Sequence, residues 1–255
     1  EAAAASGASL SSLNSIDAGG AKRPPSQVGK IAQQFKQASP ATGFGMTETN
    51  ALGLRLSGKD YIDHPGAAGL LIPPVQTLKI VADDGSDAKT GAVGELALKS
   101  AANMRGYLNK PEQTRDALRE GWMFTGDLAY QDAEGLVYIV GRKKDMIIRG
   151  GENIACPEVE GALHQIEGIL EASVFSIPHE RLGEAVGAAV YASATPSLFE
   201  LQAALEQTLA RFKIPEKIWF YPEPLPRGAT EKIDKRGIRE ACLGGAVASC
   251  GPSDN

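Results

Sequence analysis

The chain has 255 residues, of which 43% are hydrophobic and 22% are charged. These are the proportions of an ordinary globular protein, and they exclude a disordered, collagen-like or coiled-coil chain. The 31 acidic residues outnumber the 26 basic ones and leave a formal net charge of -5. Because such a chain has no general attraction for a polyanion, we expect no nucleic-acid partner.

The chain also lacks the signals of export and of membrane insertion. Residues 1–12 are rich in alanine and serine but carry no initiating Met and no basic segment, so we interpret this end as a cut rather than a signal peptide. No uncharged stretch approaches the roughly 20 apolar residues that span a bilayer. Cys156, Cys242 and Cys250 are odd in number and lack CxxC spacing, which argues against a disulfide frame or a zinc site. These features favour a cytoplasmic location.

The first half of the chain contains one helical segment and then a series of short strands. Apolar side chains at helical spacing predict an amphipathic helix over 26–37. Between 52 and 140, short apolar runs alternate with Asp-Gly and Gly-Ala turns, a pattern typical of a small barrel or sandwich. The turn at 132–135 predicts a hairpin that leads into a strand over 136–140.

After Gly141 strands alternate with helices, which indicates a compact α/β or α+β domain. Ser197 and Glu200 form a capping box, and Asp234 starts a last short helix. The polar and glycine residues 141–145 suit a hinge between two domains. The remaining elements are a helix over 158–166 and strands over 172–177, 185–192 and 217–221.

The segment 42–49 could carry nucleotide chemistry. Two glycines flank Phe44 and would let the backbone approach a planar ligand. Thr47 supplies a hydroxyl for a phosphate oxygen, and Glu48 supplies a hard carboxylate for magnesium. The same composition also fits a plain glycine-rich loop that enters the barrel.

Three further segments have a ligand-binding and a plainer interpretation. Asp127 follows a glycine, and a carboxylate so placed can accept both hydroxyls of a ribose, although it also fits a turn cap. Arg142 could hold a ribose or phosphate while Gly150 and Gly151 admit an extended ligand, although this stretch also fits a solvated basic loop. Lys232 lies in a Pro/Gly loop, where an ammonium can neutralise charge at an α-phosphate or simply face water.

In this order along the chain, the segments resemble the ANL adenylate-forming superfamily. The first motif is aromatic-Gly-x-Thr-Glu, and Gly-Glu-Leu follows it, with Met-Arg-Gly-Tyr at 104–107 and Lys-Pro-Glu at 110–112. Thr-Gly-Asp, Gly-Arg-x-Lys-Asp and a late lysine loop come next, in that order. The segment 149–154 is most similar to bacterial acyl-CoA synthetases that act on fatty or aromatic acids. The resemblance covers residues 13 to 243 and implies a ligase that uses ATP, magnesium and CoA.

The resemblance implies a fold and a domain division. Residues 1–141 would be the C-terminal part of an AMP-binding domain with a small β-barrel subdomain. Residues 142–245 would form a small α/β lid domain, and 246–255 a flexible tail. The fold class is therefore mixed α/β. Nothing before Gly19 resembles the family's phosphate-gripping loop, so we interpret the chain as the C-terminal half of such an enzyme.

The resemblance also implies roles for individual residues in the first domain. Gly19, Gly20 and Ala21 match the strand and turn beside the adenine and acyl pocket. Phe44, with Gly45 beside it, takes the place of an aromatic residue, usually Tyr, that stacks near the adenine. The polar roles are a phosphate contact for Thr47, magnesium for Glu48 and the ribose for Asp127.

The implied roles in the second domain concern the switch between two half-reactions. Lys232 is similar to the lysine of the adenylation step, and Lys144 occupies the position of the family's hinge residue. Rotation about Lys144 would withdraw Lys232 and present Gly150 and Gly151, which would line the pantetheine tunnel. Arg142 would contact the ribose or phosphate. The loop that carries Lys232 departs from the family pattern at one position. Glu231 replaces the glycine that usually precedes the lysine, and we expect it to restrict the backbone.

Two alternatives to a CoA ligase remain open on the sequence. One is an adenylating relative that passes the acyl group to a carrier protein or an amine. The other is a truncated, catalytically silent module that binds a nucleotide or a partner protein. His64, His164 and His179 lack metal-ligand spacing and predict no further site.

Overall fold

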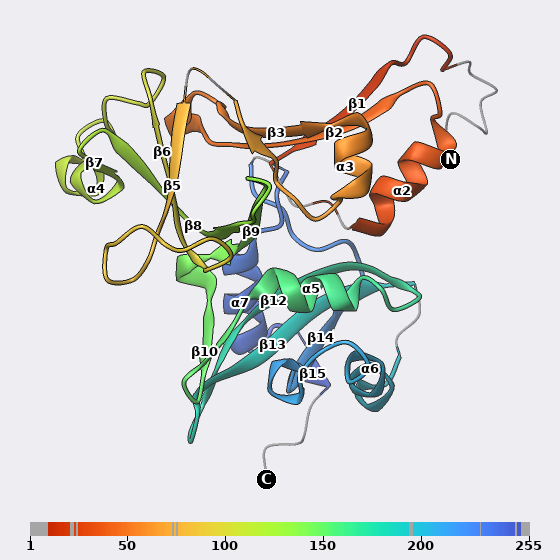
Figure 1. The fold of residues 1–255 in the computed structure, drawn as a ribbon. Coiled ribbons are helices and arrows are strands. Elements are labelled where there is room, and N and C mark those ends of the chain that lie inside the picture. The colour runs from red at the N-terminus through yellow and green to blue at the C-terminus, as the bar shows by residue number, and fades with distance from the viewer. Residues whose placement is uncertain are drawn as a thin grey trace. The chain divides into compact units, whose positions relative to one another are not determined.

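The computed structural model describes residues 10–20, 23, 25–72, 74, 76–193, 196–229, 231–247 and 249–250. The chain divides into two compact units, residues 1–139 and 140–255. Both units combine strands with helices, which confirms the mixed α/β class (Figure 1). In the part of the chain that the structure describes, no helix is long and apolar enough to cross a membrane.

The first sheet of the first unit has the strand order β1-β2-β3-β4. Strands β1 and β2 are parallel, and α2 connects them, while β3 and β4 continue the sheet in antiparallel fashion. The apolar side chains of Val28 in α2 and Tyr61 in α3 are buried with Leu56 of the sheet. The elements are β1 Ser15–Gly19, α2 Pro25–Gln34, β2 Ser39–Gly45, β3 Gly53–Ser57, α3 Gly58–Asp63 and β4 Leu70–Leu71.

The second sheet is the β subdomain that the short apolar runs predicted. Its strand order is β5-β6-β8-β7, with β9 paired to β8, and its core includes Leu96, Leu98 and Val137. The predicted hairpin is present, and Oδ1 of Asp132 accepts the Leu136 N–H at 2.8 Å. The elements are β5 Gln76–Val81, β6 Gly94–Ser100, α4 Pro111–Ala117, β7 Leu118–Arg119, β8 Trp122–Gln131 and β9 Val137–Arg142.

The second unit is built on one sheet with helices on both of its faces. Val186, Ala188 and Val190 of β13 belong to the core that α5 and α6 complete, whereas the alternating residues Ala185 and Ala189 belong to the core that α7 completes. This alternation follows from the two-residue period of a strand. The elements are β10 Ile147–Arg149, β11 Glu152–Ile154, α5 Cys156–Leu163, β12 Ile169–His179, β13 Gly183–Ala192, α6 Leu198–Leu205, β14 Lys217–Tyr221, α7 Lys235–Leu243 and β15 Ser249–Cys250.

The local signals at the helix starts are confirmed, and one segment of the predicted tail differs. Oγ of Ser197 accepts the Glu200 N–H at 3.2 Å, and Oδ1 of Asp234 accepts the Gly237 N–H at 3.1 Å. Within the stretch 246–255, which we predicted to be a flexible tail, residues 249 and 250 instead pair with β14 as a short antiparallel strand. The backbone of β14 offers an open edge there, and periodicity over so few residues gives no signal.

Candidate active site

The segment that carries Thr47 and Glu48 is a tight turn between β2 and β3. It consists of a 3-10 turn over Thr47–Thr49, followed by Asn50 and Ala51 in the left-handed region, with φ of 54° and 59°. The buried hydroxyl of Thr49 lies 2.6 Å from the Leu52 carbonyl oxygen and fixes the turn from inside. Thr47 is exposed and Glu48 is half-buried, so this turn presents two polar side chains at the end of β2.

The glycines at the ends of these strands are required by the backbone itself. A Cβ on Gly45 would lie 2.4 Å from the Ala51 carbonyl oxygen, and a Cβ on Gly53 would lie 2.0 Å from the Phe44 carbonyl oxygen. Only glycine permits two strands to approach so closely at this turn. The glycine-rich composition therefore has a structural reason independent of any ligand.

Glu48 is held by the segment 104–107, which lies in the second sheet's subdomain. The hydroxyl of Tyr107 donates to Oε1 of Glu48 at 2.7 Å, and the N–H of Met104 donates to the Glu48 carbonyl oxygen at 2.7 Å. The sequence did not single out Tyr107 as a site residue. Its only signal was its place in the Met-Arg-Gly-Tyr stretch that contributed to the family resemblance.

Asp127 lies within a bulge of β8, where residues 125–127 face a single residue of β6. The pairing with β6 shifts between Glu95 and Ala97, and Gly126 has a φ of 72°. The Gly126 N–H donates to Oε1 of Glu95 at 3.2 Å, and the buried hydroxyl of Thr125 donates to the Leu96 carbonyl oxygen at 2.8 Å. A bulge changes the direction of the side chains within it, and Asp127 is 5% exposed.

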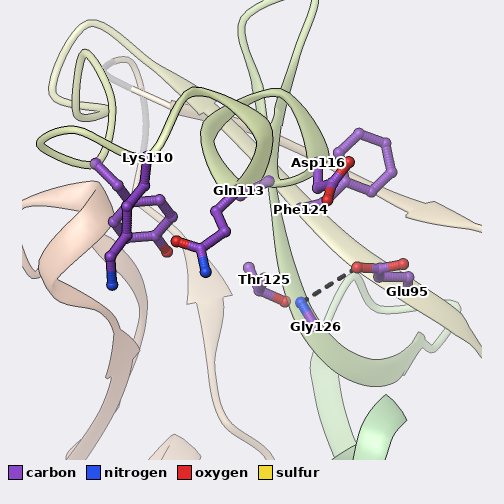
Figure 2. A pocket seen from close by; sticks show the side chains of 9 residues that line it. Glu95, Lys110, Gln113, Asp116, Phe124, Thr125 and Gly126 are labelled. Atoms are coloured by element: carbon purple, nitrogen blue, oxygen red, sulfur yellow. Dashed lines mark hydrogen bonds between the residues drawn. The ribbon is translucent and has the colours of Figure 1, made fainter.

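A cavity of about 450 Å³ lies between α4 and β8 in the first unit. Figure 2 shows Lys110 and Gln113 on the α4 side of this cavity and Thr125 and Gly126 on the β8 side. Tyr107 also lines it. The cavity is therefore bordered by the partner of Glu48 and by the two residues that precede Asp127.

Phe44 and the glycines of the first strand meet at one end of the first sheet. Gly19 pairs with Gly43 in the parallel register of β1 and β2, directly before Phe44. The Phe44 ring packs against the core of the second sheet and stays partly exposed. Gly20 has a φ of 80° and turns the chain after β1, and Ala21 lies outside the described residues. The structure thus brings Gly19 and Phe44 to neighbouring positions at one sheet end.

The candidate residues in the first part of the second unit lie on exposed turns. Arg142 ends β9, and Lys144 lies in the 3-10 turn Lys143–Asp145; both are exposed. Gly150 and Gly151 form the two-residue turn of the β10–β11 hairpin, with φ of 59° and 92°. Positive φ at both central positions is the conformation that favours Gly-Gly in such hairpins.

Lys232 lies in a loop that the structure fixes at its base. Glu171 of β12 accepts the Leu225 N–H at 2.7 Å through Oε2 and is ion-paired with Arg227 through Oε1. Across the loop, the Gly228 N–H donates to the Lys232 carbonyl oxygen at 2.9 Å. The side chain of Lys232 is exposed, so the loop presents its ammonium group to solvent.

The expected restriction at Glu231 is confirmed. This residue has a φ of 59°, a region that glycine adopts freely and that costs other residues about 1–2 kcal/mol. Arg227 donates to the Glu231 carbonyl oxygen at 2.8 Å. Because this bond uses only the backbone of Glu231, a glycine could make it as well.

Both units match the models of one enzyme family. The model described as "AMP-binding enzyme" matches residues 1–108, and the model described as "AMP-binding enzyme C-terminal domain" matches residues 158–232. The fold and the ordered motifs define the chain as one of the adenylate-forming class. The chain belongs to the AMP-binding enzyme family of the ANL superfamily.

Two curated relatives resemble most of the chain. It is 36% identical over 236 residues to an indoleacetate–CoA ligase of Aromatoleum aromaticum, covering 91% of this chain and 45% of the relative. It is 37% identical over 239 residues to a long-chain-fatty-acid–CoA ligase of Bacillus subtilis, covering 91% of this chain and 41% of the relative. The chain thus spans less than half the length of each.

Solved structures share the fold. An o-succinylbenzoate coenzyme A synthetase of Bacillus subtilis, in complex with ATP and magnesium ion, superposes with a TM-score of 0.81 at 30% identity, over 89% of this chain and 46% of that one. An amide bond synthetase of Marinactinospora thermotolerans superposes with a TM-score of 0.83 at 30% identity, over 92% and 48%.

Proposed function

We propose that the chain is part of an ATP-dependent acid–CoA ligase. The ligase activates a fatty or aromatic carboxylic acid as an acyl-adenylate and transfers the acyl group to CoA. The curated relatives support this, because one is named for indoleacetate and the other for long-chain fatty acids, and both for CoA ligation. We also propose a cytoplasmic location, because the thiols of Cys156 and Cys242 are free and free thiols persist in a reducing compartment.

One observation carries this proposal more than any other. Tyr107 hydrogen-bonds to Glu48 and also lines the cavity. The two residues that precede Asp127 line the same cavity. A phosphate contact, a metal-binding carboxylate and a ribose-binding carboxylate would therefore belong to one region of the first unit. Phe44, with Gly45, Gly19 and Gly20, would bind the adenine beside it.

The chemistry of Glu48 fits a magnesium ion carried by the nucleotide. Among the described residues no group of three or more His, Cys, Asp or Glu side chains could hold a metal by itself. Magnesium is usually bound in such enzymes by one or two carboxylates together with substrate phosphates, and a single half-buried carboxylate meets that need. When bound there, the ion would neutralise charge on the phosphates.

In the proposed mechanism the chain binds and orients reactants that are already reactive. The acid is ionised at neutral pH, so positioning and charge stabilisation account for most of the catalysis. Asp127 would contact the ribose, Arg142 would contact the ribose or a phosphate, and Lys232 would stabilise the charge between the acid and the α-phosphate. A rotation about Lys144 would then exchange Lys232 for the Gly150–Gly151 turn, beside which the CoA thiol would attack.

Each alternative has a specific observation in its favour. The structural likeness to an amide bond synthetase favours an amine as acceptor in place of the CoA thiol. The left-handed conformation of Glu231 favours a binding module with weak adenylation, since it constrains the loop of Lys232.

Calorimetric titration of AMP into the chain tests the nucleotide site. We expect Asp127→Asn to weaken AMP binding by about 10-fold or more, because hydrogen bonds to a charged group contribute about 1.5–3 kcal/mol. Asp84→Asn is the matched control, because Asp84 lies in an exposed turn and bonds only locally to Ser86. Equal AMP affinity in Asp127→Asn and the unmodified chain would contradict the assignment.

Product analysis separates the three functions. The full-length protein of which the chain is part is incubated with ATP, Mg²⁺ and a panel of indoleacetate, o-succinylbenzoate and long-chain fatty acids, with CoA or an amine, and products are identified by mass spectrometry. Acyl-CoA and AMP support the ligase, and an amide supports the amine acceptor. AMP binding without product from any acid supports the binding module.

A further inference from the structure

Glu48 is fixed at two points by a segment 59 residues away. The backbone bond from Met104 holds the carbonyl oxygen of Glu48, while the hydroxyl of Tyr107 holds Oε1 of its carboxylate. A half-buried carboxylate with one oxygen already bonded has fewer accessible rotamers, so its other oxygen points in a defined direction.

Tyr107 is itself held in place by α4. The Tyr107 N–H donates to Oγ1 of Thr114 at 2.9 Å, and the Thr114 hydroxyl donates to the Lys110 carbonyl oxygen at 2.8 Å. Gly106, with a φ of 155°, allows this approach, because a Cβ there would lie 2.8 Å from Cγ2 of Thr114. The backbone of Tyr107 is therefore fixed beside α4, at the base of the side chain that reaches Glu48.

We infer that Tyr107 is a positioning residue for Glu48, orienting its carboxylate toward the magnesium that the nucleotide carries. This inference deepens the proposed function and rests on it. Residues that hydrogen-bond to a metal ligand fix its orientation, and their loss typically lowers metal affinity 10–100-fold. Tyr107 has the geometry of such a residue, with one short bond to a single carboxylate oxygen.

Binding of Mn²⁺–ATP, followed by water-proton relaxation, tests the inference. We expect Tyr107→Phe, which keeps the ring, to weaken Mn²⁺–ATP binding about 10-fold while AMP affinity without metal stays unchanged. Glu48→Gln is the reference for loss of the ligand. Tyr130→Phe is the matched control, because that ring stacks on Tyr138 at a centroid distance of 4.9 Å and we expect no effect on metal binding.

The outcomes separate the inference from the proposed function. Weakened binding in Glu48→Gln together with unchanged binding in Tyr107→Phe would overturn the inference alone. Equal binding in Glu48→Gln and the unmodified chain would remove the metal role of Glu48 and so contradict the proposed function at this residue. A loss of thermal stability in Tyr107→Phe without a change in Mn²⁺–ATP affinity would show that the bond is only structural.

A second measurement requires no ligand. Urea unfolding of Tyr107→Phe, Glu48→Ala and the double variant forms a double-mutant cycle. We expect the two single changes to be coupled by about threefold or more in the unfolding equilibrium constant, and additive effects would overturn the positioning role.

Discussion

Nζ of Lys235, at the start of α7, lies 2.8 Å from Oε1 of Glu160 in α5. The same Glu160 oxygen accepts the Val174 N–H at 2.9 Å. Burial opposes the charged form of Lys235, but Glu160 and the neighbouring Cys156 and Asp145 outweigh it, so the pKa of this amine is raised. This ion pair therefore joins α7 to α5, which pack on opposite faces of the sheet.

We predict that the second unit loses stability in alkali. Burial raises the pKa of the Cys156 thiol from 9.0 to about 11, although nearby Lys235 acts in the opposite direction. Between pH 9 and 11 the folded chain therefore keeps a proton that the unfolded chain has lost, and stability falls as pH rises. Urea unfolding at pH 8 and pH 11 should differ by about 2 kcal/mol from this group, and the raised pKa of Lys235 adds to the loss above about pH 10.5.

Two variants separate this titration from packing. Cys156→Ala should remove a large part of the pH dependence between pH 9 and 10, and Cys242, whose thiol pKa is also raised by burial, should account for the remainder. Val159→Ala in the same helix leaves a cavity but no titrating group, so it should destabilise the chain at every pH and keep the slope. A full slope in Cys156→Ala would refute the assignment to this thiol.

Replacement of Glu231 by glycine should stabilise the chain. Relief of the left-handed conformation contributes about 1 kcal/mol, less the extra entropy of an unfolded glycine. Thermal unfolding should show a raised Tm for Glu231→Gly. Glu231→Ala removes the charge but keeps the Cβ, so a comparable gain in that control would assign the effect to charge instead of backbone conformation.

Substitution of Gly53, the first residue of β3, should destabilise the chain. In Gly53→Ala the new Cβ would meet the Phe44 carbonyl oxygen at 2.0 Å, and we expect a loss of about 3 kcal/mol or more. Gly29→Ala is the control, since beyond its chain neighbours and the backbone of α2 nothing lies within 4 Å of its Cβ position, and alanine favours helices by about 0.5–1 kcal/mol. Equal effects of the two changes on urea unfolding would contradict the close approach at Gly53.

The loop of Lys232 should become mobile when its anchor is removed. Glu171→Ala leaves Leu225 N–H and Arg227 without their carboxylate partner, so hydrogen exchange over 225–234 should accelerate. We expect a stability loss of about 1–3 kcal/mol, because a buried donor is left unpaired.

The exposed ion pair between Arg236 and Glu240 provides the control for the Glu171→Ala variant. Glu240→Ala should leave the urea unfolding curve nearly unchanged, since surface ion pairs contribute little to stability. Unchanged exchange over 225–234 in Glu171→Ala would show that the loop is held by other contacts.

Features that depend on a few neighbouring residues could be predicted from the sequence. The capping box at Ser197, the helix start at Asp234 and the Gly150–Gly151 turn were readable because their hydrogen bonds or φ angles are set locally. Ordered motifs were sufficient to indicate the family. Short pairings such as β15 gave no periodic signal, since two residues have no measurable period.

Contacts between side chains that are far apart in the sequence could not be predicted and became visible only in the folded chain. Tyr107 and Glu48 are 59 residues apart, and Lys235 and Glu160 are 75 apart. No local pattern encodes such pairs, because they depend on how sheets and helices pack after each element has formed. The bulge that contains Asp127 likewise depends on the register of β6 against β8, which is set by the two strands together and not by either sequence alone.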